Sequence, residues 1–238
     1  PVAQLMSDAP QPDRELDGTG KGRLKGWDAV ALALPLAVTL WLYGRSLGYG
    51  FFNDDPTGHF AWMERYDIGR LYVISAGYGF FRPLVFTAWK LLWSLFQGYQ
   101  AAAFHGLSLT FHVGNVLLVY LLSRRLGGRL YATVASLAFS CFPFNYEAVA
   151  YVAALFHPML TCLALLALLA YDQYLSTKRR RFLAAVVLLH LLALLTHENG
   201  VIIPALLLGW DFCLRPPARW RDILQRWSIR LGAVSLAY

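Results

Sequence analysis

Long apolar runs alternate along this chain with short polar segments that carry most of its lysines and arginines. Basic clusters favour the cytoplasmic side of a membrane, so an even number of crossings should separate one cluster from the next. The clusters lie at residues 21–25, 124–129, 178–181 and 215–230. Spans that satisfy this condition are residues 27–43, 104–122, 131–144, 158–175, 182–196 and 201–214, and a seventh starts at residue 233. The pattern predicts an all-α, polytopic membrane protein with about six to seven transmembrane helices.

The apolar run of residues 84–96 does not fit as a span. A crossing needs roughly 20 residues, whereas this run is shorter and carries Lys90 in its middle. Counting it as a span would also move Arg124 and its neighbours to the outer side. We therefore predict an amphipathic helix lying at the outer surface. It belongs to a long outer segment, residues 44–103, with a second surface helix predicted at residues 56–70.

Composition supports a membrane protein and argues against other classes. Hydrophobic residues make up 58% of the 238 residues and charged residues only 15%, whereas soluble domains have about 25% charged residues. The net charge of +7 comes from basic residues beside apolar runs. Without a basic face or a recognition motif, this charge does not indicate a nucleic-acid partner. Cys141, Cys162 and Cys213 lie within or beside apolar runs, and we predict that they are buried packing residues.

The chain divides into a tail and a membrane domain. Residues 1–26 are polar and lack an apolar period, which predicts a disordered cytoplasmic tail. No cleavage-type site of small residues follows the first apolar run, so this run is predicted to be an uncleaved signal anchor. Residues 27–238 form the transmembrane domain. Because the chain begins without methionine and ends inside an apolar run, we expect this domain to continue in a longer polypeptide.

Several charged or titratable side chains fall on the predicted outer side, many of them at the ends of spans. They are Asp54, Asp55, His59, Glu64, Arg82, Glu147, His157, His197 and Glu198. Charged residues at membrane depth are costly and are usually functional. The last two spans are short and meet at "THENG", residues 196–200, a pattern typical of broken helices that line a cavity. These features predict a polar pocket on the outer face, where a lipid-bound reactant meets a water-borne one.

Three stretches of this region resemble the GT-C glycosyltransferases, integral membrane enzymes that use polyprenyl-phosphate sugars. They are "NDD" at residues 53–55, "FFRPLVFTAW" at 80–89 and "FPFNYEAVAYVAALFHPML" at 142–160. The last two look most like the transmembrane and tetratricopeptide O-mannosyltransferases, and "THENGVIIP" at 196–204 occupies the place of that group's "KE.GIT" turn. "FHGLSLTFHVGNVLLVYLLSRRLGG" at 104–128 is similar to a span and turn shared by protein O-mannosyltransferases and lipid A aminoarabinose transferases. The resemblance implies an inverting glycosyltransferase of the bacterial cytoplasmic membrane, with its active site facing outside.

The resemblance also assigns roles to outer residues. Asp54 takes the place of the family's catalytic base or acceptor-orienting group, and Asp55 follows it as a second carboxylate. A carboxylate suits an inverting transfer, which needs a group that deprotonates or orients the acceptor hydroxyl. The leaving phosphate needs cationic or donor groups. Arg82 is the main candidate, and Lys90 and His197 are weaker ones. The predicted substrate-binding residues are Arg82, Glu147, His157, His197 and Glu198.

The implied donor is a polyprenyl-phosphate sugar, and the implied acceptor is a protein, a lipid or a glycan. A divalent metal is left open as a cofactor, and no metal-binding residues are predicted. This chain departs from the family where related enzymes carry "GRAD", because residues 154–157 read "ALFH" and His197 replaces a lysine. These departures keep two alternatives open. One is a non-catalytic structural subunit of a membrane complex, and the other is a transporter for a lipid-linked anion.

Each candidate also has a purely structural interpretation. Asp54 and Asp55 fit the start of a helix at Pro56, where an acidic cap is common. Arg82 fits an interfacial anchor whose charged end reaches water. The other four candidates fit exposed loops, caps or turns. His105 and His112 lie on one helical face, and we predict that they are buried, hydrogen-bonding histidines rather than a metal-binding pair.

Overall fold

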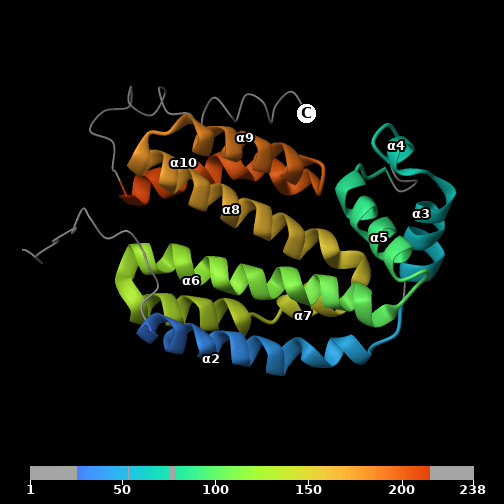
Figure 1. Cartoon of the computed structure of the whole chain (residues 1–238), viewed down its shortest axis with the longest axis horizontal. Coiled ribbons are helices and arrows are strands. Elements are labelled where there is room, and N and C mark those ends of the chain that lie inside the picture. Colours follow the sequence, from blue (N-terminus) through green and yellow to red (C-terminus); the bar gives the residue numbers. More distant parts are fainter. Residues whose placement is uncertain (1–25, 53, 75–78, 215–238) are drawn as a thin grey trace, which may run out of the picture.

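The computed structural model describes residues 26–52, 54–74 and 79–214, which are 85% helical and contain no strand. The all-α class is therefore confirmed for these residues. In chain order the elements are α2 (Gly26–Tyr43), η1 (Gly44–Gly48), η2 (Asp55–Phe60), α3 (Ala61–Arg65), α4 (Ile68–Leu71), α5 (Pro83–Leu95), α6 (Ala101–Ser140), α7 (Asn145–Ala150), η3 (Val152–Leu155), α8 (Phe156–Thr177), α9 (Arg180–Leu194), η4 (Glu198–Ile202) and α10 (Ile203–Leu214). Figure 1 shows the long helices side by side, with α3, α4 and α5 gathered at one end. The predicted tail up to residue 25, Asn53, the basic cluster from residue 215 and the run from residue 233 lie outside the described residues.

The helix α6 turns back on itself at Gly128. This residue has φ 77° and ψ −165°, a conformation that glycine adopts without steric cost. The two halves of α6 consequently run in opposite directions (Figure 1). The second half lies beside α2. Asp28 pairs with Arg129, and Thr39 hydrogen-bonds with Ser140, so the two helices run parallel. Two separate spans, residues 104–122 and 131–144, were predicted on either side of this turn, and Gly128 makes the reversal between the two halves possible.

Helices α8, α9 and α10 form the other part of the bundle. Their shared core contains Ala167 and Tyr171 from α8, Val186 and Ala193 from α9, and Leu207 from α10. The helix α8 ends where Lys178 adopts a left-handed conformation with φ 55°, a common way to end a helix. These three helices occupy the residues predicted as the last three spans.

Within the residues that the structure describes, three segments are long and apolar enough to cross a membrane, namely Gly26–Gly48, Ala101–Ser140 and Val152–Thr177. They indicate a membrane-embedded protein. The helices α9 and α10 have 15 and 12 residues, fewer than the roughly 20 that a perpendicular crossing needs. The full set of six to seven spans stays a prediction.

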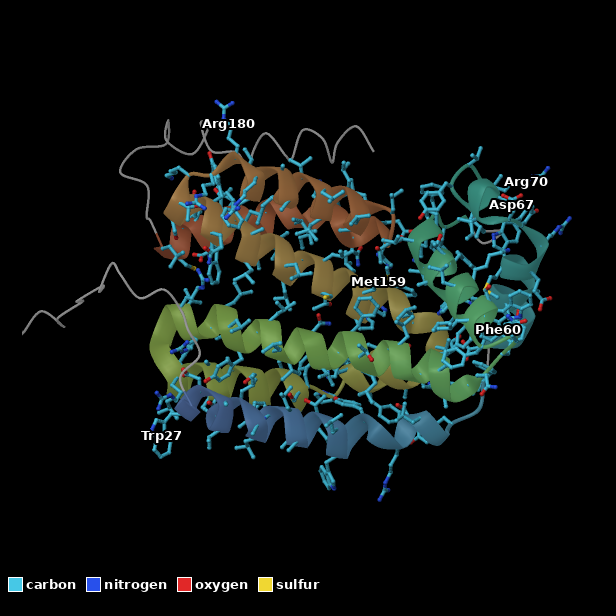
Figure 2. The ribbon with its side chains drawn as sticks, in the orientation of Figure 1. Trp27, Phe60, Asp67, Arg70, Met159 and Arg180 are labelled. Carbon is cyan, nitrogen blue, oxygen red and sulfur yellow. The ribbon has the colours of Figure 1, made fainter. Side chains whose placement is uncertain are left out.

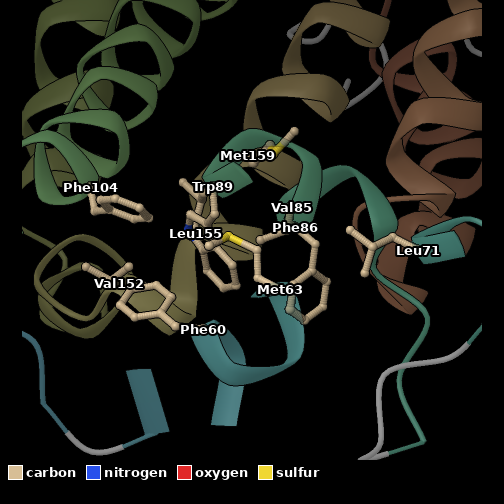
Figure 3. Close-up of a cluster of buried hydrophobic side chains, with 10 residues drawn as sticks. All are labelled: Phe60, Met63, Leu71, Val85, Phe86, Trp89, Phe104, Val152, Leu155 and Met159. Carbon is tan, nitrogen blue, oxygen red and sulfur yellow. The ribbon is translucent and has the colours of Figure 1, made fainter. Parts of the chain in front are cut away.

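The segment between α2 and α6 packs as a helical cap on one end of the bundle. The predicted helix at residues 84–96 is present as α5, and the one predicted at 56–70 is present as the three short elements η2, α3 and α4. A buried cluster fixes this cap to α6 and η3 (Figure 3). Its members include Phe60, Met63, Trp89, Phe104 and Leu155. The position of these helices at a membrane surface stays a prediction.

The two ends of the bundle carry different chemistry. At one end, Asp28 is fully buried and pairs with Arg124 at 2.9 Å and Arg129 at 3.2 Å. Trp27 and Arg180 mark this basic end in Figure 2, and Phe60 and Asp67 mark the opposite end. The described basic turns therefore gather at the end opposite the cap, and the side of the membrane that each end faces stays a prediction.

The prediction for the cysteines was partly wrong. Cys141 and Cys213 are exposed, and Cys162 is partly buried. An apolar sequence context does not separate the protein core from a lipid-facing surface, because lipid tails are as apolar as leucine. His105 and His112 are buried, as predicted.

Candidate functional site

A cavity of about 260 Å³ opens where the cap meets the bundle. Its lining comes from three separate segments of the chain and combines charged groups with aromatic rings. The lining residues are Asp54, His59, Phe80, Arg82, Glu147, Tyr151, Ala153, Ala154, Phe156 and His157. A few convergent polar groups in a partly apolar recess are typical of small-molecule sites. Four of the predicted site residues therefore meet in one cavity.

Asp54 is exposed and precedes the helix η2, but its carboxylate makes no capping hydrogen bond to that helix. The capping interpretation is therefore wrong for Asp54. Its backbone is held instead: the N–H donates to the Tyr151 hydroxyl at 3.4 Å, and the carbonyl lies 3.2 Å from His59 Nδ1. This arrangement fixes the main chain of Asp54 while its side chain lines the cavity.

Asp55 has the opposite environment. It is fully buried and is not part of the cavity lining. Its Oδ1 accepts from the Ala153 N–H at 2.8 Å and its Oδ2 accepts from the Phe52 N–H at 3.3 Å. Burial raises the pKa of Asp55 above its ordinary value, although the two N–H groups act against this shift. Asp55 thus ties the cap to the segment before α8.

Arg82 is held between two aromatic rings. Its guanidinium carbon lies 4.4 Å from the centre of the Phe80 ring and 4.1 Å from that of Phe156, distances suited to cation–π contact. Its Nε and Nη2 donate to Glu198 Oε2 at 3.3 and 3.0 Å. The Leu84 N–H also donates to the Leu195 carbonyl at 3.1 Å. The start of α5 is therefore fixed against the turn between α9 and α10.

His197 and Glu198 lie behind Arg82 and outside the cavity lining. Burial would raise the pKa of Glu198, but its own backbone N–H and the Arg82 guanidinium bring that pKa below its ordinary value. Burial, followed by Arg82, lowers the pKa of His197. His197 Nδ1 accepts from the Asn199 N–H at 3.0 Å, which fits a neutral ring. Glu198 is thus placed to orient Arg82, whereas His197 stacks on Phe156 with ring centres 4.7 Å apart, and neither residue lines the cavity.

Glu147 and His157 are exposed and face the cavity from α7 and α8. Lys90, a weaker candidate for phosphate binding, lies elsewhere. Its amine donates to the carbonyls of Met63, at 2.8 Å, and Tyr66, at the end of α3. It therefore stabilises the end of a helix. In the part of the chain that the structure describes, no group of three or more His, Cys, Asp or Glu side chains is placed to hold a metal ion.

Sequence reasoning placed His59 on the outer side without giving it a role, and it missed three contributors to this site: Tyr151, Phe80 and Phe156. Phe80 and Phe156 belong to quoted motifs, but nothing in their spacing predicts that they enclose Arg82. One signal could have identified Tyr151. It lies between Glu147 and Ala153 in a quoted motif, and both of these residues line the cavity. Comparisons with protein-family models, curated proteins and solved structures found no match to this chain.

Proposed function

We propose that this protein is an inverting glycosyltransferase that moves a sugar from a polyprenyl-phosphate donor to an acceptor hydroxyl in this cavity. One observation supports the proposal most directly: a carboxylate without a capping role, Asp54, lines the same cavity as an oriented guanidinium, Arg82. A base and a phosphate-binding group are the two elements that such a transfer requires.

In the proposed reaction, the acceptor oxygen attacks the anomeric carbon of the donor sugar. A new carbon–oxygen bond forms, the bond from that carbon to the phosphate oxygen breaks, and the phosphate leaves with the electron pair. Asp54 accepts the hydroxyl proton. Because attack and departure occur on opposite faces of the sugar, the configuration at the anomeric carbon inverts.

Arg82 is proposed to bind the donor phosphate. A guanidinium has five N–H donors in a planar fork. Glu198 engages donors at Nε and Nη2, so others remain for a phosphate oxygen. The rings of Phe80 and Phe156 limit rotation of the fork, and such preorganisation lowers the cost of ordering when the ligand binds. Glu147 and His157 are proposed to contact the sugar or the acceptor from the other side of the cavity.

The proposed orientation puts the cavity on the outer face of a bacterial cytoplasmic membrane. The described basic turns, at Arg124 to Arg129 and Lys178 to Arg181, lie at the opposite end of the bundle (Figures 1 and 2). Basic turns favour the cytoplasmic side, so the cap would face outward, where a protein, lipid or glycan acceptor meets the lipid-borne sugar.

The test is sugar transfer by the full-length polypeptide in polyprenol-containing membranes. Radiolabelled polyprenyl-phosphate mannose and other polyprenyl-phosphate sugars are supplied separately, and wild type is compared with Asp54→Asn. We expect transfer from one donor and its loss, by about a hundredfold or more, in a variant that keeps the wild-type thermal midpoint.

Glu64→Gln is the matched control. Glu64 is an exposed acid of the same cap whose Oε1 accepts from the Tyr99 hydroxyl at 2.7 Å, and it does not line the cavity. This variant should transfer sugar at the wild-type rate. If the folded wild-type protein neither binds nor turns over any donor, a non-catalytic subunit of a membrane complex becomes the better explanation. Donor movement across the membrane without transfer would instead indicate a transporter.

A further inference from the structure

The segment between α7 and α8 contacts both aspartates of the cap. Ala153 donates its N–H to the buried Asp55, as described above, and Tyr151 reaches Asp54. The Tyr151 hydroxyl accepts from the Asp54 N–H at 3.4 Å. Tyr151 thus holds the main chain of Asp54, and both residues line the cavity.

The ring of Tyr151 is itself held in place. It stacks on Phe52, with ring centres 5.2 Å apart and planes inclined by 26°. Tyr151 is partly buried and lines the cavity beside Asp54. The hydrogen bond from the Ala153 N–H to Asp55 joins the same two chain segments. The stacking on Phe52 and the bond between Ala153 and Asp55 therefore fix the position of the phenol beside Asp54.

We infer that Tyr151 is the positioning residue for Asp54: its hydroxyl accepts from the Asp54 N–H and fixes the main chain that carries the carboxylate at the cavity. This inference rests on the proposed function for its catalytic consequence, but the contact itself is independent of any activity. Small displacements of a reacting group are costly, since a shift of about 1 Å can reduce a rate about a hundredfold.

The electrostatic surroundings agree with this geometry. Burial raises the pKa of Tyr151, and the negative charges of Asp54 and Asp55 raise it further. The other titratable groups of the cavity are His59, Arg82, Glu147 and His157. A protonated phenol can still accept from the Asp54 N–H, because its oxygen keeps its lone pairs.

Kinetics of Tyr151→Phe provide the first test. The substitution keeps the ring on Phe52 and removes only the hydroxyl. We expect kcat to fall about tenfold to about a hundredfold, while KM for the donor stays within about twofold because Arg82 is untouched. The matched control is Tyr146→Phe, which removes an exposed hydroxyl of the same segment whose partner is Tyr49 at 3.5 Å. An unchanged kcat in Tyr151→Phe would overturn the inference.

A second readout does not depend on activity. Tyr151 is replaced by difluorotyrosine, a residue whose phenol ionises near neutral pH. Fluorine NMR of the full-length protein then gives the pH midpoint of this ionisation. Because the Asp54 charge opposes ionisation of the phenol, the midpoint should move to lower pH in Asp54→Asn and stay constant in Glu64→Gln. An unmoved midpoint in Asp54→Asn would show that the phenol does not lie beside Asp54. A wild type without transfer activity would overturn the proposed function, whereas the NMR result would still decide the contact.

Discussion

Arg82 and Glu198 form an ion pair between two segments that lie 116 residues apart in the sequence. Nε and Nη2 of Arg82 both donate to Oε2 of Glu198, and the side chains are 14% and 42% exposed. The cap and the turn between α9 and α10 are fastened together at this point, next to the cavity. The pair sets the position of the guanidinium proposed to bind phosphate.

Loss of the charge in Glu198→Gln should lower stability in a pH-dependent way. The pKa of Glu198 is lowered in the folded protein. The stabilisation is therefore fully present above its ordinary pKa of 4.5 and is lost as the pH falls through the lowered value. Because the acid is partly exposed, we expect a loss of about 1 kcal/mol at neutral pH. Thermal midpoints of wild type and Glu198→Gln, measured from about pH 7 to about pH 3, should converge at the acidic end. A difference that persists there would contradict the assignment.

Arg82→Lys should weaken donor binding although it keeps the charge. Lysine lacks the planar fork and stacks poorly on Phe80 and Phe156. We expect KM for the polyprenyl-phosphate donor to rise about tenfold or more, with a smaller change in kcat. Arg70→Lys, on an exposed arginine of α4, is the control and should bind donor normally. Equal donor affinity in Arg82→Lys and wild type would remove Arg82 from the phosphate site.

The two adjacent aspartates should respond differently to substitution. Asp55→Ala leaves the buried N–H groups of Ala153 and Phe52 without their acceptor, and we expect a loss of about 2 to 4 kcal/mol together with a lower thermal midpoint. Asp54→Asn should lose activity with an unchanged midpoint. The measurement is a thermal denaturation curve of each variant in the same detergent. If Asp54→Asn were the more destabilised of the two, their roles would be reversed.

Gly200→Ala should disturb the turn that carries Glu198. An added Cβ would lie 2.8 Å from the Ala193 carbonyl carbon and 2.8 Å from the Leu194 nitrogen, and backbone atoms cannot rotate away. We expect a destabilisation of about 1 to 3 kcal/mol and a higher donor KM, because Arg82 loses its fixed partner. Gly209→Ala is the control, since nothing lies within 4 Å of the added Cβ. Identical behaviour of the two variants would show that the turn can relax.

Asp28→Asn should affect stability without affecting catalysis. It leaves Arg124 and Arg129 beside a neutral side chain at the basic end, far from the cavity. The arginines are 26% and 46% exposed, so we expect a moderate loss of about 1 to 3 kcal/mol. The thermal midpoint should fall, and kcat per folded molecule should equal that of wild type. A specific loss of kcat would mean that the two ends of the bundle are coupled.

The sequence by itself determined where the helices lie. The apolar runs between the basic turns predicted the positions of α2, both halves of α6, α8, α9 and α10. In an apolar environment, a run of this kind satisfies its backbone hydrogen bonds most simply as a helix. Runs of that kind say little about which side faces the protein, which is why Cys141 and Cys213 were predicted to be buried and are exposed.

Tertiary structure decided how the polar residues divide their roles. Asp54 and Asp55 are adjacent in the sequence, yet one lines the cavity and the other is buried, because neighbouring side chains point in different directions and only packing decides which direction faces a cavity. Tyr151 was missed for the same reason. Likewise, Glu198 lies behind Arg82 instead of in the cavity. Hydrophobic periodicity is a local property of the chain, whereas a functional site depends on contacts between distant segments.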